Sequence, residues 1–311
     1  VVDLKDGVFE SASVDTSIFI LRRALKGAPS GHKVRIGECR AKDVGVVTTP
    51  TNSIDQKKLL AQTGYIFNTS ASEAAMGLLG KIRKAGRPLE TMVIVKNGMK
   101  VRKELLAAAR KDERYKRFIV GGHIDRYFIR PTDRWVCYDR RLEAKFTNQA
   151  FRDEIIFTAP EKLLVRQVYG KEGIHCAVDR HKLYCDQTCY ILLPKGGSSL
   201  LDYMAGIVGS ALMRFFFERT MSDRKATFPK IKGDQLKQLP IVVAQDKERK
   251  ELEGIVESIS KLKADALAAK LPNQVQQLQQ RIAHTEERLN AAVYQIYGLT
   301  ENEVRMVEEA I

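Results

Sequence analysis

The sequence predicts an α+β protein, in which a mixed β-rich domain with interspersed helices precedes a C-terminal helical hairpin. Short β-rich runs bounded by turns fill the middle of the chain, and amphipathic helical segments interrupt them without regular alternation. From residue 246 onward the periodicity is helical throughout. A chain of 311 residues with 44% hydrophobic content can bury a core and form two domains, or one domain with an appendage.

Six runs rich in β-branched and aromatic residues predict strands. They cover residues 91–95, 126–130, 134–138, 154–158, 162–169 and 190–193. Apolar residues at helical spacing predict helices over residues 73–84, 103–111 and 201–218.

The last third of the chain predicts two long helices that fold back on each other. Leu252, Ile255, Ile259 and Leu262 mark the first helix, which should end at Leu271-Pro272. The second should begin after Asn273, with a heptad seam of Val275, Leu278, Ile282, Thr285, Leu289, Ala292 and Ile296. Gly298 fits a helix stop, and Thr300-x-x-Glu303 fits a capping box that starts a last short helix. Such a hairpin is either a docking arm or an amphipathic pair that covers its own core.

Positive charge is concentrated before residue 246. The whole chain carries a net +14, and residues 246–311 hold 9 basic and 12 acidic residues, which leaves +17 for residues 1–245. A field of this sign favours polyanions, so nucleic acid is the expected partner class, with a generic basic surface as the alternative.

No segment suits a membrane span or a signal peptide, which predicts a soluble, cytoplasmic protein with no membrane partner. The five cysteines, too few and odd in number for a disulfide framework, are expected to be reduced thiols.

Six motifs occur in a fixed order along the chain. They are GRPLETMVIVKNGMKV (86–101), RFIVGGHIDRYFIRP (117–131), APEKLLVRQVYGKEGIHCAVD (159–179), LLDYMAGIVGSALMRFFFE (200–218), FPKIKGDQLKQLPIVV (228–243) and VYQIYGLTENEV (293–304). Their order resembles the TaqI-like C-terminal specificity domain, which is found in adenine-specific DNA methyltransferases and single-chain restriction-modification enzymes. Residues 1–24 resemble the last strands of the methyltransferase domain that precedes this module.

The resemblance implies three parts. Residues 1–45 would be the tail of a methyltransferase domain with a linker, 46–245 the DNA target recognition domain, and 246–311 a helical arm. It implies double-stranded DNA and the methyltransferase domain of the same polypeptide as partners. In the family the segment between Pro229 and Pro240 leads into the helices, so these prolines would fix the direction of that exit.

Catalysis of methyl transfer is not expected from these residues. The family's Asn/Asp-Pro-Pro-Tyr/Phe motif is absent, and so is a glycine-rich cofactor loop after an early strand. S-adenosylmethionine is therefore implied only for the parent enzyme, and no cofactor or metal is expected here.

A DNA-recognition domain needs cations that pair with phosphates and side chains that read base edges. The run from Gly121 to Arg126 offers both, although a glycine turn with Asp125 paired to Arg126 or Arg130 is an equal alternative, as is a plain hairpin turn at Asn97-Gly98. The predicted DNA-binding residues are Lys96, Asn97, Lys100, Arg102, His123, Asp125, Arg126, Arg130, Arg166, Arg180, Lys182, Arg224, Lys225, Lys230 and Lys232.

Two other chemistries are alternatives with less support. Asp125 or Asp139 with Glu143-x-Lys145 is similar to the carboxylate and lysine set of a stand-alone metal-dependent nuclease, or is simply an exposed charged turn. A zinc site could use His175, Cys176, His181, Cys185 and Cys189, but the spacing lacks a Cys-x-x-Cys pair and suits a strand with half-buried thiols.

Overall fold

A computed structural model describes residues 1–4, 8–9, 16–23, 31–39, 52–60, 73–145, 150–196, 200–221 and 230–311. The chain divides into two compact units, Val1–Gly80 and Lys81–Ile311, and each is described separately. None of the helices in these described ranges combines the length and apolar character that a membrane span requires.

The first unit contains a four-stranded sheet in the order β2-β1-β3-β4. Its strands are β1 (Val2–Leu4), β2 (Thr16–Ile18), β3 (Lys33–Cys39) and β4 (Asn52–Asp55), followed by helix α1 (Gln56–Leu60). Strand β1 runs parallel to β3, and the other pairs are antiparallel. Ile36, Ile54 and Leu59 form its buried cluster. Helix α2 (Glu73–Ala85) confirms the helix predicted over 73–84.

The second unit is built on two four-stranded sheets. The first, β13-β12-β15-β6, is antiparallel and comprises β6 (Val93–Asn97), β12 (Lys162–Arg166), β13 (Cys176–Asp179) and β15 (Cys189–Pro194). The second, β14-β8-β11-β7, comprises β7 (Leu106–Ala107), β8 (Tyr115–Ile119), β11 (Trp135–Cys137) and β14 (Tyr184–Cys185). The short strands β5 (Arg87–Pro88) and β16 (Pro240–Ile241) pair with each other, as do β9 (Ile124–Asp125) and β10 (Phe128–Ile129).

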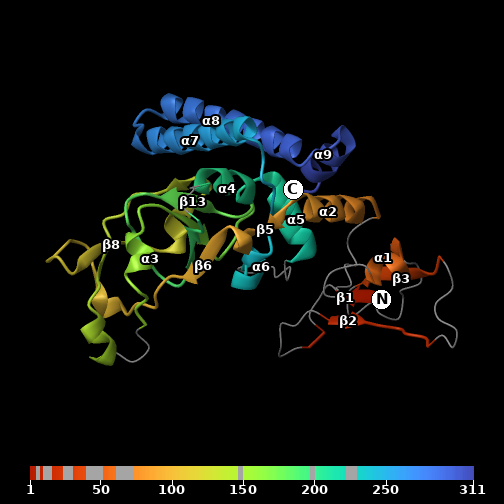
Figure 1. Ribbon diagram of the computed structural model, residues 1–311, viewed down its shortest axis with the longest axis horizontal. Helices are drawn as coiled ribbons and strands as arrows, with labels where there is room; N and C mark the ends of the chain where they lie inside the picture. The colour runs from red at the N-terminus through yellow and green to blue at the C-terminus, as the bar shows by residue number, and fades with distance from the viewer. Residues whose placement is uncertain are drawn as a thin grey trace. The chain divides into compact units, whose positions relative to one another are not determined.

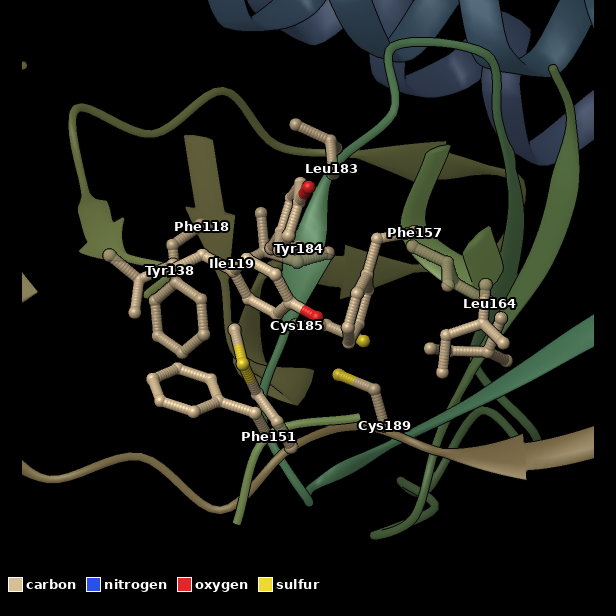
Figure 2. Packing of buried hydrophobic residues seen from close by; sticks show 14 of the residues in the cluster. Phe118, Ile119, Tyr138, Phe151, Phe157, Leu164, Leu183, Tyr184, Cys185 and Cys189 are labelled. Carbon is tan, nitrogen blue, oxygen red and sulfur yellow. The ribbon is translucent and has the colours of Figure 1, made fainter. Parts of the chain in front are cut away.

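Aromatic rings fill the core between these sheets. Phe157 stacks on Tyr184 with ring centroids 4.6 Å apart, and Tyr138 meets Phe151 edge-on at 5.1 Å. Figure 2 shows these rings beside the thiols of Cys185 and Cys189. These buried rings form one close-packed cluster, to which both sheets contribute.

Two predicted segments are wrong. Residues 154–158 form a short helix, α3 (Ile155–Thr158), because Ala159 is extended before Pro160 and only Ile156 and Phe157 are buried. The predicted helix over 103–111 is instead a 3-10 turn, η4 (Lys103–Leu105), followed by β7, because pairing with β11 overrides the local helical pattern.

The helices predicted after residue 200 are confirmed. Helices α4 (Leu201–Val208) and α5 (Ala211–Thr220) occupy the predicted helical stretch but break at Gly209, and Ser210 caps α5. Helices α7 (Asp246–Ala268) and α8 (Pro272–Ile296) form the hairpin, with Pro272 opening α8 at its first turn instead of ending α7. Gly298 has φ +63°, and the Thr300–Glu303 capping box begins α9 (Glu301–Glu308).

The two long helices lie side by side and cover α4 (Figure 1). Leu278, Thr285 and Leu289 of the heptad seam are buried, and α8 packs on α7, α5 and α4. Within the second unit the hairpin thus covers a core that it shares with α4, and its outer face is exposed.

Candidate nucleic-acid interface

Strand register brings several predicted residues to one end of the sheet β13-β12-β15-β6. Arg166 pairs with Cys189 across β12 and β15, and Asn97 pairs with Tyr190 across β6 and β15. Lys96 and Asn97 are exposed, and Arg166 is half-buried. We call this edge the Arg166 end, and its opposite, where Lys162 pairs with Asp179, the Lys162 end.

The 3-10 turn η5 (Gly121–His123) attaches to the Arg166 end. The amide of Gly121 donates to Thr188 Oγ1 at 2.7 Å. A Cβ on Gly121 would lie 2.8 Å from the Thr188 carbonyl oxygen, so only glycine allows this approach. The sequence predicted that the two glycines would let the backbone approach a ligand closely. Gly121 instead approaches Thr188 of the same protein, and Gly122 is exposed.

Lys230 and Lys232 reach the same end from a distant part of the chain. Val168 and Lys230 form an isolated β-bridge, and the Ile231 amide donates to the Gln167 carbonyl at 2.9 Å. Ile231 is buried, so the two lysines on either side of it are exposed. Pro240, which pairs with Pro88, then directs the chain toward α7.

His123 is a neutral hydrogen-bonding group near neutral pH. Burial lowers its pKa below the ordinary value, and the charges of Arg134 and Arg130 act in the same direction. A hydrogen bond between His123 Nδ1 and the Val120 carbonyl, at 3.3 Å, partly opposes this lowering of the pKa. Arg134, which sequence reasoning did not include, is exposed close to this ring.

Asp125 and Arg130 pair with each other, as the alternative interpretation of this segment expected. Arg130 Nε lies 3.1 Å from Asp125 Oδ2, and its guanidinium also donates to the Gly122 carbonyl. Arg130 is still 47% exposed, so its second face can meet a phosphate. Asp125 is occupied by the ion pair.

The side chain of Arg126 is largely buried beside the helical hairpin, and its contact with DNA stays a prediction. Its side chain is only 11% exposed and forms an ion pair with Glu286 of α8, to which Lys263 of α7 also binds at 3.0 Å. The turn between β9 and β10 points Arg126 toward the helical hairpin, and Tyr127 takes φ 65° to complete that turn. The residue therefore joins the arm to the sheet domain.

The remaining predicted cations are dispersed. Arg180 and Lys182 follow β13 at the Lys162 end, and Arg180 pairs with Asp202 and Glu161. Arg102 pairs with Glu104 at 3.0 Å, and Lys100 is exposed beyond β6. Arg224 and Lys225 lie outside the described residues.

The carboxylates of the nuclease alternative are already engaged. Asp139 accepts two hydrogen bonds from the Arg141 guanidinium, which lower its pKa to about 2 despite the opposing effect of burial. Glu143 accepts a hydrogen bond from the Phe151 amide at 3.0 Å. Asp139 is thus paired with an arginine, and Glu143 is bonded to a backbone amide.

The thiols and histidines of the zinc alternative, all of which the structure describes, do not form one cluster. Burial raises the pKa of the Cys176 thiol to about 12, and its sulfur contacts the Ala205 carbonyl. His175 Nδ1 lies 3.3 Å from the Ile124 carbonyl. Across the described ranges, no three His, Cys, Asp or Glu side chains cluster in a way that could hold a metal ion.

The second unit is thus an α+β domain that gathers exposed cations and hydrogen-bonding side chains at one end of a rigid sheet, which is the arrangement of a specificity domain. Residues 116–241 match the family model of the TaqI-like C-terminal specificity domain. The family expected from the sequence motifs is confirmed. A comparison with curated proteins gives no match.

Comparison with solved structures finds the following similarities. The type IIL restriction-modification enzyme MmeI, in complex with DNA, is similar with a TM-score of 0.50 and 13% identity over 72% of this chain and 36% of that chain. The type IIG restriction endonuclease BpuSI gives 0.47 and 12% over 85% and 40%. The HsdS subunit from Thermoanaerobacter tengcongensis gives 0.37 and 12% over 72% and 52%. The chain thus spans a little over a third of the MmeI length.

Proposed function

We propose that this chain is the double-stranded DNA recognition module of an adenine-specific DNA methyltransferase or restriction-modification enzyme. Within it, the Arg166 end would face DNA. The single observation that supports this most is the convergence of Lys96, Arg166, Lys230 and Lys232 at one end of a rigid sheet in a family of specificity domains. These four cations come from three segments that are far apart in the sequence, so local composition alone does not explain their meeting.

The chemistry of the Arg166 end suits duplex DNA. Its lysines and Arg134 provide charges for phosphates, while neutral His123 and the amide of Asn97 can exchange hydrogen bonds with base edges. Specific binding needs both kinds of group, because phosphate contacts set position and base contacts select sequence.

The rest of the proposal concerns the parent enzyme. Residues 1–45 would continue a methyltransferase domain, 46–245 would recognise the site, and 246–311 would serve as the arm. That domain would act on an adenine flipped out of the duplex. The residues of this chain do not fit S-adenosylmethionine, because they lack the glycine-rich loop, so no methyl-transfer step is assigned to them.

A charge-reversal experiment tests the proposed surface. The triple variant Lys96→Glu, Lys230→Glu and Lys232→Glu should lower affinity for duplex DNA by at least tenfold at about 50 mM salt, measured by fluorescence anisotropy. The matched control replaces three exposed lysines of the helical arm, Lys247, Lys250 and Lys270, with Glu. Its affinity for duplex DNA should stay much closer to that of the wild type. Equal losses in both variants would mean that the surface is misplaced.

A further inference from the structure

The turn between β14 and β15 carries an exposed glutamine, Gln187, at the Arg166 end. We propose that Gln187 reads a base edge in the recognised DNA site and that Thr188 is its positioning residue. This inference rests on the proposed function and names the side chain that would carry part of its specificity.

The turn is closed by its own polar groups. The Asp186 carboxylate accepts hydrogen bonds from the Thr188 amide, at 3.1 Å, and from the Thr188 hydroxyl. The Cys189 amide donates to the Asp186 carbonyl at 3.1 Å. Hydrogen bonds among Asp186, Thr188 and Cys189 therefore fix the backbone on both sides of Gln187, as in Asx and Ser/Thr turns.

Neighbouring segments fix the turn from outside. Thr188 Oγ1 accepts the Gly121 amide, and the Thr188 carbonyl accepts the Gln167 amide at 2.9 Å. On the other side, the amide of Gly98 donates to the Cys189 carbonyl at 3.0 Å. A Cβ on Gly98 would lie 2.0 Å from the Asp186 carbonyl oxygen, so β6 and the turn are in direct backbone contact.

The core holds both ends of the turn. Cys185 and Cys189 are fully buried, and Figure 2 shows their thiols within the aromatic cluster. A side chain on such a support has a fixed origin, and placement within about half an ångström is what specific recognition requires.

The chemistry of Gln187 suits a base more than a phosphate. A primary amide carries a donor and an acceptor together, which match N6 and N7 of adenine in the major groove. Cations that can pair with the flanking phosphates, Lys96 and Lys230, lie at the same end of the sheet. Gln187 therefore lies at the same end of the sheet as cations that can bind phosphates, at a position where an uncharged side chain can form hydrogen bonds with a base.

The test is selection from a randomised duplex library with the full 311-residue chain. The wild type should enrich a defined motif. Gln187→Ala should lose preference at one base pair by about 5- to 100-fold, while bulk affinity for unrelated duplex changes less than about twofold. Gln187→Glu should shift the preference at that position toward cytosine, since a carboxylate accepts from its N4 amino group.

Two further variants separate reading from positioning. Thr188→Val should weaken preference at the same base pair, and Thr188→Ser, which keeps the hydroxyl, should restore it. Gln279→Ala removes an exposed amide on α8 and should select the wild-type motif.

The possible failures are distinguishable. If Gln187→Ala selects the wild-type motif unchanged, the inference is overturned and the proposed function stands. Wild-type binding without any sequence preference would also overturn the inference. A wild-type chain that retains no duplex at low salt would overturn both.

Discussion

The guanidinium of Arg126 and the carboxylate of Glu286 form a largely buried ion pair that joins the β9–β10 hairpin to helix α8. Lys263 binds the second oxygen of the same carboxylate at 3.0 Å and donates to the Arg126 carbonyl at 3.1 Å. Two helices and one hairpin therefore share a single acidic group.

Removing one partner of this network should destabilise the protein. Arg126→Ala leaves Glu286 and Lys263 with an incomplete set of contacts, and the loss of one member of a buried pair costs about 3–5 kcal/mol. Urea denaturation would measure the change. Lys261→Ala, on the exposed face of α7, should stay within about 0.5 kcal/mol of the wild type.

The same variant distinguishes a structural role from DNA contact. DNA affinity of Arg126→Ala should fall only as far as its folded fraction falls. The triple variant Arg126→Met, Lys263→Met and Glu286→Leu should recover stability, because no unpaired buried charge remains. Wild-type stability combined with a selective loss of DNA binding would contradict this assignment of Arg126.

Salt dependence should report the phosphate contacts of the Arg166 end. Affinity of the wild type for duplex DNA should fall steeply between about 50 and 200 mM salt, because phosphate neutralisation releases counterions. Lys230→Ala should reduce the slope of log affinity against log salt by about one, and Lys270→Ala should leave it unchanged. An unchanged slope for Lys230→Ala would remove this lysine from the interface.

The buried pair of Lys162 and Asp179 should matter for stability alone. Both side chains are fully buried, 2.5 Å apart, and Asp179 also accepts the amides of His181 and Leu183. Asp179→Ala should therefore cost at least the roughly 3–5 kcal/mol expected for a broken buried pair. Thermal unfolding would check this, and a change within about 0.5 kcal/mol would contradict it.

Stability should decrease as the pH falls from about 7 to 5. Burial lowers the pKa of His175 below its ordinary value of 6.5, and Arg166 adds to this, while a hydrogen bond to Ile124 and the Asp125 charge oppose it. The unfolded state then binds a proton more readily than the folded state, so acidification favours unfolding as the pH passes below 6.5. His175→Gln should flatten this part of the pH profile of urea denaturation. A profile equal to the wild type would show that other groups cause the loss.

The sequence by itself determined the features that depend on neighbours along the chain. The helical hairpin, the Gly298 stop and the Thr300 cap follow from apolar spacing, backbone freedom and side-chain capping, which act within a few residues. The α+β class follows from the same local patterns, and ordered motifs identified the family. The Asp-x-Thr spacing at residues 186–188 could also have indicated a tight turn beside Gln187.

Only the tertiary structure decided which charges lie together. Local pattern did not distinguish Arg126 from Arg166, yet hairpin pairing directs Arg126 to α8 while strand register brings Arg166 beside the β15 turn. Long-range pairing also made residues 106–107 a strand. These outcomes depend on contacts between segments far apart in sequence, whose energies exceed local propensity and leave no periodic signal in the chain.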